Sequence, residues 1–222
     1  MIATRDLYLA SFLSNAVILV FEISGGRLLA PYIGTSVEVW AGLIAVILGS
    51  MAVGYHFGGR LADRIATRAI ISFFFFAAGV SALTAWGMRD LVPTTFLSVD
   101  FARTLEALFI GGIIFAPTVA ALAAISPLVA KNLITGLDRS ARVVGTLNAV
   151  GTVGSIAGAI ATGILLIPLF GVGEILLGTA ISLVLFSLYL SRSDVGIKAA
   201  VLIAFVTTSF MLNAMPTRAS IA

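Results

Sequence analysis

Glu22 is an acidic residue inside an apolar stretch, in the run Val20-Phe-Glu-Ile-Ser-Gly-Gly-Arg27. A carboxylate at membrane depth costs about 2.5–3.5 kcal/mol on insertion scales, so it should face the interior of a helix bundle and have a partner. A site for a cation or proton and a structural hydrogen bond to a neighbouring helix both account for it. Arg27 lies five positions later, well round the helix, and should extend to the lipid headgroups or act as a ligand. Glu22 is therefore the first candidate for substrate binding, and Arg27 is the second.

The next apolar stretch carries two further candidates. Glu38 begins it beside Trp40. A charge at a helix N-terminus next to an interfacial tryptophan is favourable by itself, and a substrate gate is the functional alternative. His56 lies near the other end and is the candidate for a proton relay, because imidazole exchanges protons near neutral pH. A single histidine in a membrane helix is more often an interhelical hydrogen-bonding group, the role we also assign to Asn15 and Asn148.

The residue types that are missing from the chain exclude several kinds of site. There is no cysteine, which rules out disulfides, thiol catalysis and thiolate metal sites, and a single histidine makes a histidine metal cluster unexpected. The run Gly171-Val-Gly-Glu174 resembles the start of a glycine-rich nucleotide loop, but it lies between two apolar stretches without the strand and helix that such a loop needs. We therefore expect no catalytic residue, metal, cofactor or nucleic-acid partner, and no enzyme activity in this chain alone.

The elements that must position the candidate residues are transmembrane helices. Of the 222 residues, 60% are hydrophobic and 10% are charged, whereas an average soluble domain has roughly 45–50% apolar and about 25% charged residues. Too few polar side chains remain to cover a soluble globule, so an integral membrane protein is predicted. Charges and turn residues divide the chain into seven apolar segments, long enough on the whole for helices that cross a bilayer. The predicted fold is a single all-α bundle of about seven transmembrane helices within residues 1–222: 7–29, 37–58, 69–88, 105–130, 143–170, 175–191 and 197–215.

Basic residues predict how this bundle is oriented, because cytoplasmic loops are enriched in lysine and arginine. With the N-terminus inside, nine basic residues fall on the cytoplasmic side, and only Arg89, Arg103 and Arg218 fall outside. The N-terminus is therefore expected in the cytoplasm, and seven spans place the C-terminus outside the cell's inner membrane. The nine cytoplasmic residues are Arg5, Arg60, Arg64, Arg68, Lys131, Arg139, Arg142, Arg192 and Lys198.

The fifth segment contains a run of small residues, GTLNAVGTVGSIAGAIATG, from position 145 to 163. Gly154 and Gly158 form a Gly-x-x-x-Gly pair, and Gly151 and Gly163 extend it into a face that lets two helices approach closely. The pattern leaves open whether the partner helix belongs to the same chain or to a second copy.

The most specific local pattern is the run GGRLADRIATR from position 58 to 68. It resembles the loop between helices two and three of the major facilitator superfamily, Gly-x-Leu-Ala-Asp-Arg-x-Gly-Arg-Arg, from which Ala66 and Thr67 depart. An acidic residue at a helix end followed by arginines can hold neighbouring helices in one state, so the resemblance implies a conformational latch. Its four residues are Gly59, Asp63, Arg64 and Arg68.

Longer blocks resemble the membrane domain of fused major-facilitator/spermidine-synthase proteins. They include positions 22–36, 54–64 and 147–158, and similar blocks extend over about residues 7–190. The resemblance implies half of a facilitator-like bundle, normally followed by a soluble aminopropyltransferase-like domain. After Met215 only seven residues remain, so no catalytic residue of that domain can be carried over, and the chain is either stand-alone or truncated.

The expected function is transport or binding of a small organic cation such as a polyamine, with Glu22, Glu38 and Arg27 as candidate ligands. The alternative is a non-catalytic membrane anchor for an aminopropyltransferase-like enzyme that is encoded separately or removed. Since one bundle supplies half of the usual facilitator enclosure, we expect a homodimer in the lipid bilayer, packed through its glycine-rich faces.

Overall fold

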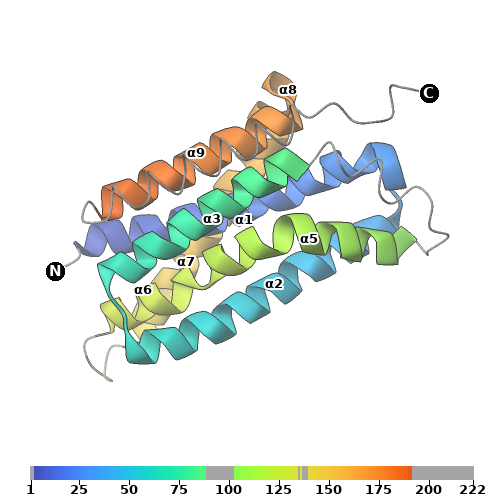
Figure 1. Ribbon diagram of the computed structural model, residues 1–222. Helices are drawn as coiled ribbons and strands as arrows, with labels where there is room; N and C mark the ends of the chain where they lie inside the picture. Colours follow the sequence, from blue (N-terminus) through green and yellow to red (C-terminus); the bar gives the residue numbers. More distant parts are fainter. Residues whose placement is uncertain (1–2, 89–102, 135, 137–139, 192–222) are drawn as a thin grey trace.

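The computed structural model describes residues 3–88, 103–134, 136 and 140–191, and this part of the chain is a bundle of long helices (Figure 1). Six helices are long and apolar enough to cross a membrane, which confirms an all-α membrane bundle. The seventh predicted span, 197–215, lies outside the described residues. The helices are α1 (Thr4–Ile33), α2 (Val37–Arg64), α3 (Arg68–Met88), α5 (Arg103–Ala123), α6 (Ile125–Leu133), α7 (Ser140–Ile160), the π-helical η2 (Ala161–Leu166), α8 (Ile167–Leu169) and α9 (Val172–Leu190).

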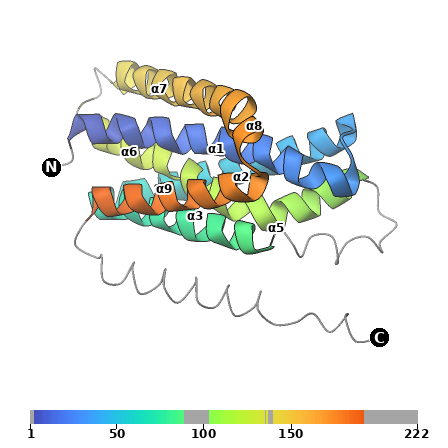
Figure 2. The same ribbon diagram turned by 90° about the horizontal axis from the view of Figure 1, so that it is seen from above.

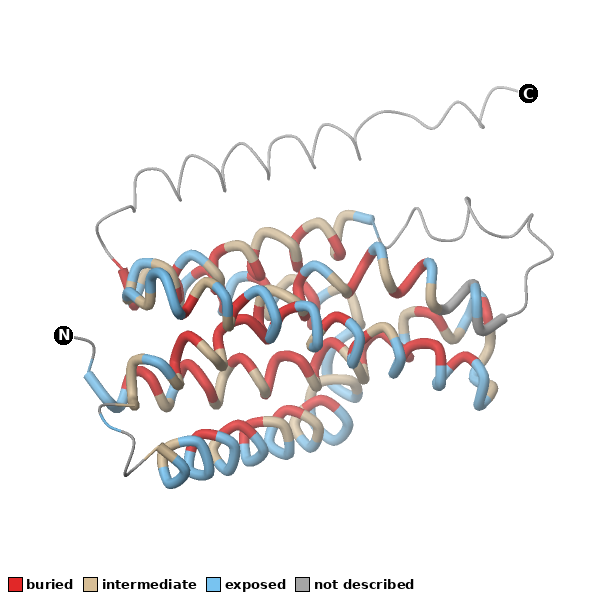
Figure 3. The backbone as a smooth tube through the Cα atoms, turned by 90° about the horizontal axis from the view of Figure 1, so that it is seen from below, coloured by how far each residue is buried: buried red, intermediate tan, exposed pale blue. Residues whose placement is uncertain are grey.

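Each of the first three helices packs along one later helix. The most extensive pairings are α1 with α7, α2 with α5 and α3 with α9, and Figures 1 and 2 show α3 beside α9 and α1 beside α7. The α1 helix also lies against α2, α5, α6 and α9, so it is the most central element, and α5 in addition lies against α3. Buried positions face inward along the helices, and exposed positions face outward (Figure 3). We call the end where α1 begins and α9 finishes the N-terminal end of the bundle.

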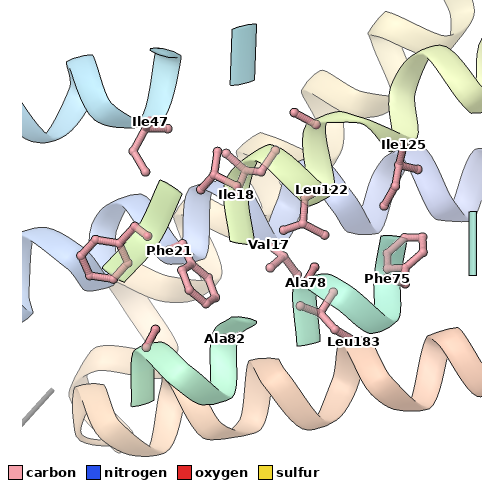
Figure 4. Close-up of a cluster of buried hydrophobic side chains, with 14 of the residues drawn as sticks. Val17, Ile18, Phe21, Ile47, Phe75, Ala78, Ala82, Leu122, Ile125 and Leu183 are labelled. Atoms are coloured by element: carbon pink, nitrogen blue, oxygen red, sulfur yellow. The ribbon is translucent and has the colours of Figure 1, made fainter. Parts of the chain in front are cut away.

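The interior is built from aliphatic and aromatic side chains of α1, α2, α3, α5, α6 and α9 (Figure 4). Phe21, Phe75 and Phe115 are fully buried, and the rings of Phe21 and Phe115 meet edge to face with centroids 6.1 Å apart. Phe21 directly precedes Glu22 in the chain, so the packing of its ring in this centre holds in place the part of α1 that carries Glu22.

Glycines allow the backbones to approach in all three pairings. A Cβ on Gly54 would overlap the carbonyl oxygen of Ala120 in α5, and a Cβ on Gly79 would lie 2.7 Å from the side chain of Val184 in α9. In α7, Gly154 lies over the backbone of Phe12 in the same way. Small residues therefore replace long side chains at the lines where the helices touch, as is usual within membranes.

Prolines explain two departures from the predicted continuous spans. The fourth span is divided at Ala124, between α5 and α6, and Pro127 follows in the first turn of α6. The fifth changes from α7 to the wider π-helical turns of η2, just before Pro168. Proline has no N–H to donate, and its ring crowds the carbonyl four residues earlier, here that of Ile164. The wider turns relieve this contact, and the N–H of Ile167 bonds to the oxygen of Thr162 instead.

Candidate functional site

Glu22 lies well inside the bundle's length. It is about 27 Å along α1 from Thr4 and about 16 Å from the end of the helix at Ile33, at 1.5 Å per residue. The side chain is half-buried, and it forms no hydrogen bond or ion pair with any residue in the described part of the chain. A carboxylate at this depth without a partner is the least satisfied charged group on α1.

Two aromatic rings from other helices pack against the turn of α1 that follows Glu22. Gly25 and Gly26 have no side chains, and the ring of Phe115 comes within 3.0 Å of the place where a Cβ on Gly25 would be. The indole of Trp40 in α2 comes within 2.6 Å of the corresponding point on Gly26. Residues four apart lie on the same face of a helix, so the Trp40 indole lies one turn above Glu22 on its own side of α1.

This arrangement suits a cation that carries an ammonium group. A carboxylate accepts charge-assisted hydrogen bonds from an ammonium, and the face of an indole ring attracts the same positive charge. Trp40 is 39% exposed, so part of its ring remains accessible. The sequence predicts Trp40 as an interfacial anchor, and only its packing against Gly26 places its ring one helical turn from Glu22.

The other proposed ligands do not join Glu22. Arg27 is exposed and about 140° round α1 from Glu22, and it forms no ion pair with a described residue. Glu38 is exposed, and its carboxylate accepts a hydrogen bond of 3.2 Å from the Ser36 hydroxyl. It precedes Trp40 by two positions, which points it to the far side of α2. His56 is also exposed and lies edge to face against Phe57, with ring centroids 5.5 Å apart.

The two asparagines are placed differently from each other. The amide of Asn15 donates to the carbonyl of Ser11, at 2.9 Å, and lies against Gly151 of α7. It is on the same side of α1 as Glu22. Asn148 is exposed on α7, where its backbone oxygen accepts from the hydroxyl of Thr152.

The four residues of the expected latch form no single cluster. Asp63 is 3.8 Å from Lys131 of α6, and both side chains are largely exposed. Arg64 is exposed, and Gly59 has open space where a Cβ would be. Arg68 instead reaches Asp6 of α1. Asp63 and Arg68 thus hold two different helices, both at the N-terminal end of the bundle.

Asp6 is the centre of a polar cluster that joins α1, α3 and α9. Its carboxylate accepts hydrogen bonds from the Tyr189 hydroxyl at 3.2 Å and from the Arg68 guanidinium at 3.5 Å. Arg68 also donates to the carbonyl oxygen of Tyr189, at 3.4 Å, and Asp6 is only 5% exposed. Sequence reasoning missed this cluster, because an acidic residue in the first turn of a helix is common without any tertiary role.

The glycine face of α7 packs on α1 of the same chain. Gly154 and Gly158 lie over the backbones of Phe12 and Ala16, and Gly151 lies against Asn15. Gly163 has no such neighbour and is outside this contact. In the described structure these three glycines are therefore covered by α1, and a dimer would need a different surface.

Within the described ranges, no three His, Asp or Glu side chains gather in a way that could hold a metal ion. Comparisons of the chain with protein-family models, curated proteins and solved structures found no match. The candidate site therefore rests on the geometry of Glu22 and Trp40 alone.

Proposed function

We propose that this multi-pass membrane protein binds and transports a small organic cation of the polyamine class, with Glu22 as its charged ligand and Trp40 as its aromatic ligand. One observation carries the proposal: Glu22 is half-buried at membrane depth and has no partner among the described residues. Intramembrane carboxylates are costly and usually mark ion or substrate pathways. A ligand that brings its own positive charge would supply the missing partner.

The side of α1 that carries Glu22 lies between α2 and α7, where a substrate path could run. Trp40 of α2 and Gly151 of α7 meet α1 on this side, and α2 and α7 have little contact with each other. We propose that a second copy of the chain completes the enclosure here, consistent with the half-size facilitator-like bundle that the sequence resembles. Light scattering in detergent tests this part, and a monomer at all concentrations would contradict it.

The orientation is also part of the proposal. In the described structure, Arg5, Arg60, Arg64, Arg68 and Lys131 lie at the N-terminal end of the bundle. The positive-inside rule supports a cytoplasmic location for this end, in the inner membrane of the cell. Asp63 and Arg68 would then connect neighbouring helices on the cytoplasmic side, as a latch between transport states.

Uptake into proteoliposomes tests the proposal. Purified protein is reconstituted, and entry of labelled putrescine or spermidine is compared with that into empty vesicles. We expect uptake by the wild type, loss of at least about 90% of it in Glu22→Gln, and no loss in Glu38→Gln, because Glu38 already bonds to Ser36 and points away from Trp40. A tenfold loss corresponds to about 1.4 kcal/mol, which is modest for the removal of a charge-assisted contact.

Two outcomes would contradict the proposal that the protein transports polyamines. The first is wild-type uptake that does not exceed that of empty vesicles, which would favour the membrane-anchor alternative. The second is equal uptake by wild type and Glu22→Gln, which would remove Glu22 from the site.

A further inference from the structure

A second candidate site lies on the opposite side of α1 from Glu22. A groove of about 610 Å³ runs between α1, the α7–η2–α8 segment and α9. Val17 and Val20 form its floor, Ala161 and Leu166 form one wall, and Gly178 lies in the other. The groove is partly open to the surroundings and is formed by the membrane-spanning helices.

The groove follows from the π-helical segment. The wider turns of η2 and the end of the helix after Pro168 redirect the chain toward α9, so α7 and α9 are both packed on α1 but not closely on each other. Gly178 adds no side chain to fill the space, and a Cβ there would have no neighbour within 4 Å. π-helical turns inside α-helices occur frequently at functional sites.

The charged group that lines the groove lies at one end of it. The hydroxyls of Thr179 and Ser182 donate to carbonyls of their own helix, at 2.6 and 2.7 Å, so they add no free donor to the groove. Glu174, in the first turn of α9, is exposed at the mouth and forms no ion pair or hydrogen bond with a described residue. The groove is thus an apolar channel with one acidic group at its end.

Arg27 is a positively charged residue of α1 beyond the end of the groove lining. It is seven residues, or two helical turns, after Val20 and therefore on the groove side of α1, and helical side chains lean back toward the N-terminus. Glu174 lines this end of the groove, and Arg27 lies about 10 Å beyond Val20 along α1, so the same end of the apolar groove offers one negative and one positive charge. This pattern complements a zwitterionic headgroup with a hydrocarbon chain below it.

We propose that this groove binds one bilayer phospholipid with a primary-ammonium headgroup, phosphatidylethanolamine. Its ammonium would pair with Glu174, its phosphate with Arg27, and one acyl chain would lie in the groove. A primary ammonium donates hydrogen bonds to a carboxylate, which the quaternary ammonium of phosphatidylcholine cannot do. An anionic headgroup such as phosphatidylglycerol would leave Glu174 without its partner.

The groove is shorter than a transmembrane helix of a second copy. Along α1 the lining extends from Phe12 to Val20, about 12 Å, and along α9 from Glu174 to Ser182, again about 12 Å. A helix that crosses the bilayer is about 30 Å long, so the groove would cover less than half of its length. This site is independent of the polyamine proposal, since it shares no residue with the Glu22 and Trp40 site.

Retention of lipid during purification tests the inference. The wild type is incorporated into nanodiscs of equal parts phosphatidylethanolamine, phosphatidylcholine and phosphatidylglycerol, extracted with mild detergent, and its retained phospholipids are quantified by mass spectrometry. We expect phosphatidylethanolamine to be enriched about fivefold over the bulk ratio, as an ion pair of about 1 kcal/mol would give. Wild type without enrichment of this lipid would overturn the proposal whatever the variants do.

Three variants separate the parts of the site. Gly178→Leu, whose Cβ would meet nothing within 4 Å, should extend into the groove and lower the retained lipid about fivefold, whereas Gly163→Leu, at another position with open space around the Cβ, should retain lipid like the wild type. Glu174→Gln should keep the amount of lipid but lose the preference for phosphatidylethanolamine over phosphatidylcholine. Equal retention by Gly178→Leu and Gly163→Leu would contradict the location. A wild-type dimer that Gly178→Leu converts to a monomer, without retained lipid in either, would show that a second copy occupies the groove.

Discussion

Two carboxylates of the same helix, Asp6 and Glu22, are in opposite situations. Asp6 lies at the N-terminal end of α1, is 5% exposed, and accepts hydrogen bonds from Arg68 of α3 and Tyr189 of α9. Glu22 lies deeper in the bundle, is half-buried, and has no partner in the described structure. The first carboxylate is used to hold three helices together, while the second leaves its charge available. An unpartnered carboxylate inside the bundle destabilises it until a ligand with a positive charge binds there.

The contacts between helices near Asp6 and near Glu22 also differ in whether polar groups join them. Between α3 and α9, Ser72 and Ser187 exchange hydrogen bonds of 2.7 Å with each other's carbonyl oxygens, so polar groups lock this pair. On the Glu22 side, α7 is held on α1 mainly by the close approach of its glycines. The bundle therefore combines a side joined by polar contacts with a side joined by packing alone, and the predictions below separate the two.

Asp6→Ala should produce the largest loss of stability. Removal of one partner from a buried ion pair costs about 3–5 kcal/mol, and here we expect about 2–3 kcal/mol, because the Arg68 side chain is 38% exposed and can reach water. Unfolding by denaturant in detergent measures the change. Asp63→Ala is the matched control, since its exposed pair with Lys131 should contribute less than about 0.5 kcal/mol. Equal losses for the two variants would contradict the structural role of Asp6.

Gly154→Leu tests the side that is joined by packing. A Cβ at this position would meet the carbonyl oxygen of Phe12, which cannot move aside as a flexible side chain would. Overpacking of this kind costs about 1–3 kcal/mol, so we expect about 2 kcal/mol in the same unfolding assay. Gly163→Leu, with open space around its Cβ, should change stability by less than about 0.5 kcal/mol. If Gly154→Leu is as stable as this control, α7 is not held on α1 through that glycine.

Trp40→Leu should have a smaller effect, and on binding rather than on folding. Loss of a cation–π contact of about 1 kcal/mol weakens putrescine binding about fivefold, which titration calorimetry in nanodiscs can measure. Trp40→Phe keeps an aromatic face and should restore most of the affinity. Unchanged affinity in Trp40→Leu would leave Glu22 as the only ligand of the site.

The spans and the separate elements of the site were predictable, but their contacts were not. Because the bilayer imposes a minimum length, apolar runs bounded by charges predict six of the spans to within four residues, except that α2 continues six residues beyond the predicted end at 58. Glu22 could be singled out for a similar reason, since a charge within an apolar run is costly wherever the helix packs.

The features that sequence reasoning missed depend on which helices meet. Tyr189 and Arg68 become partners of Asp6 only because α9 and α3 lie beside α1, and Trp40 becomes a neighbour of Glu22 only because Gly26 admits its ring. The π-helical turns before Pro168 are a local response to that proline, yet a kink, a tilt and a helix end would all have fitted the sequence. Spacing along one helix carries no information about which residues of other helices become its neighbours, and here these partners lie 18 (Trp40), 62 (Arg68) and 183 (Tyr189) positions away in the chain.

The most direct test of the account is thermal unfolding of Glu22→Gln, with and without putrescine. We predict that putrescine at ten times its dissociation constant stabilises the wild type by about 1.4 kcal/mol. Glu22→Gln should unfold at or above the temperature of the ligand-free wild type, because it loses an unpartnered charge, and should show no shift with putrescine. A Glu22→Gln protein that is as destabilised as Asp6→Ala, or that putrescine stabilises like the wild type, would contradict the assignment of Glu22 as a ligand-binding carboxylate.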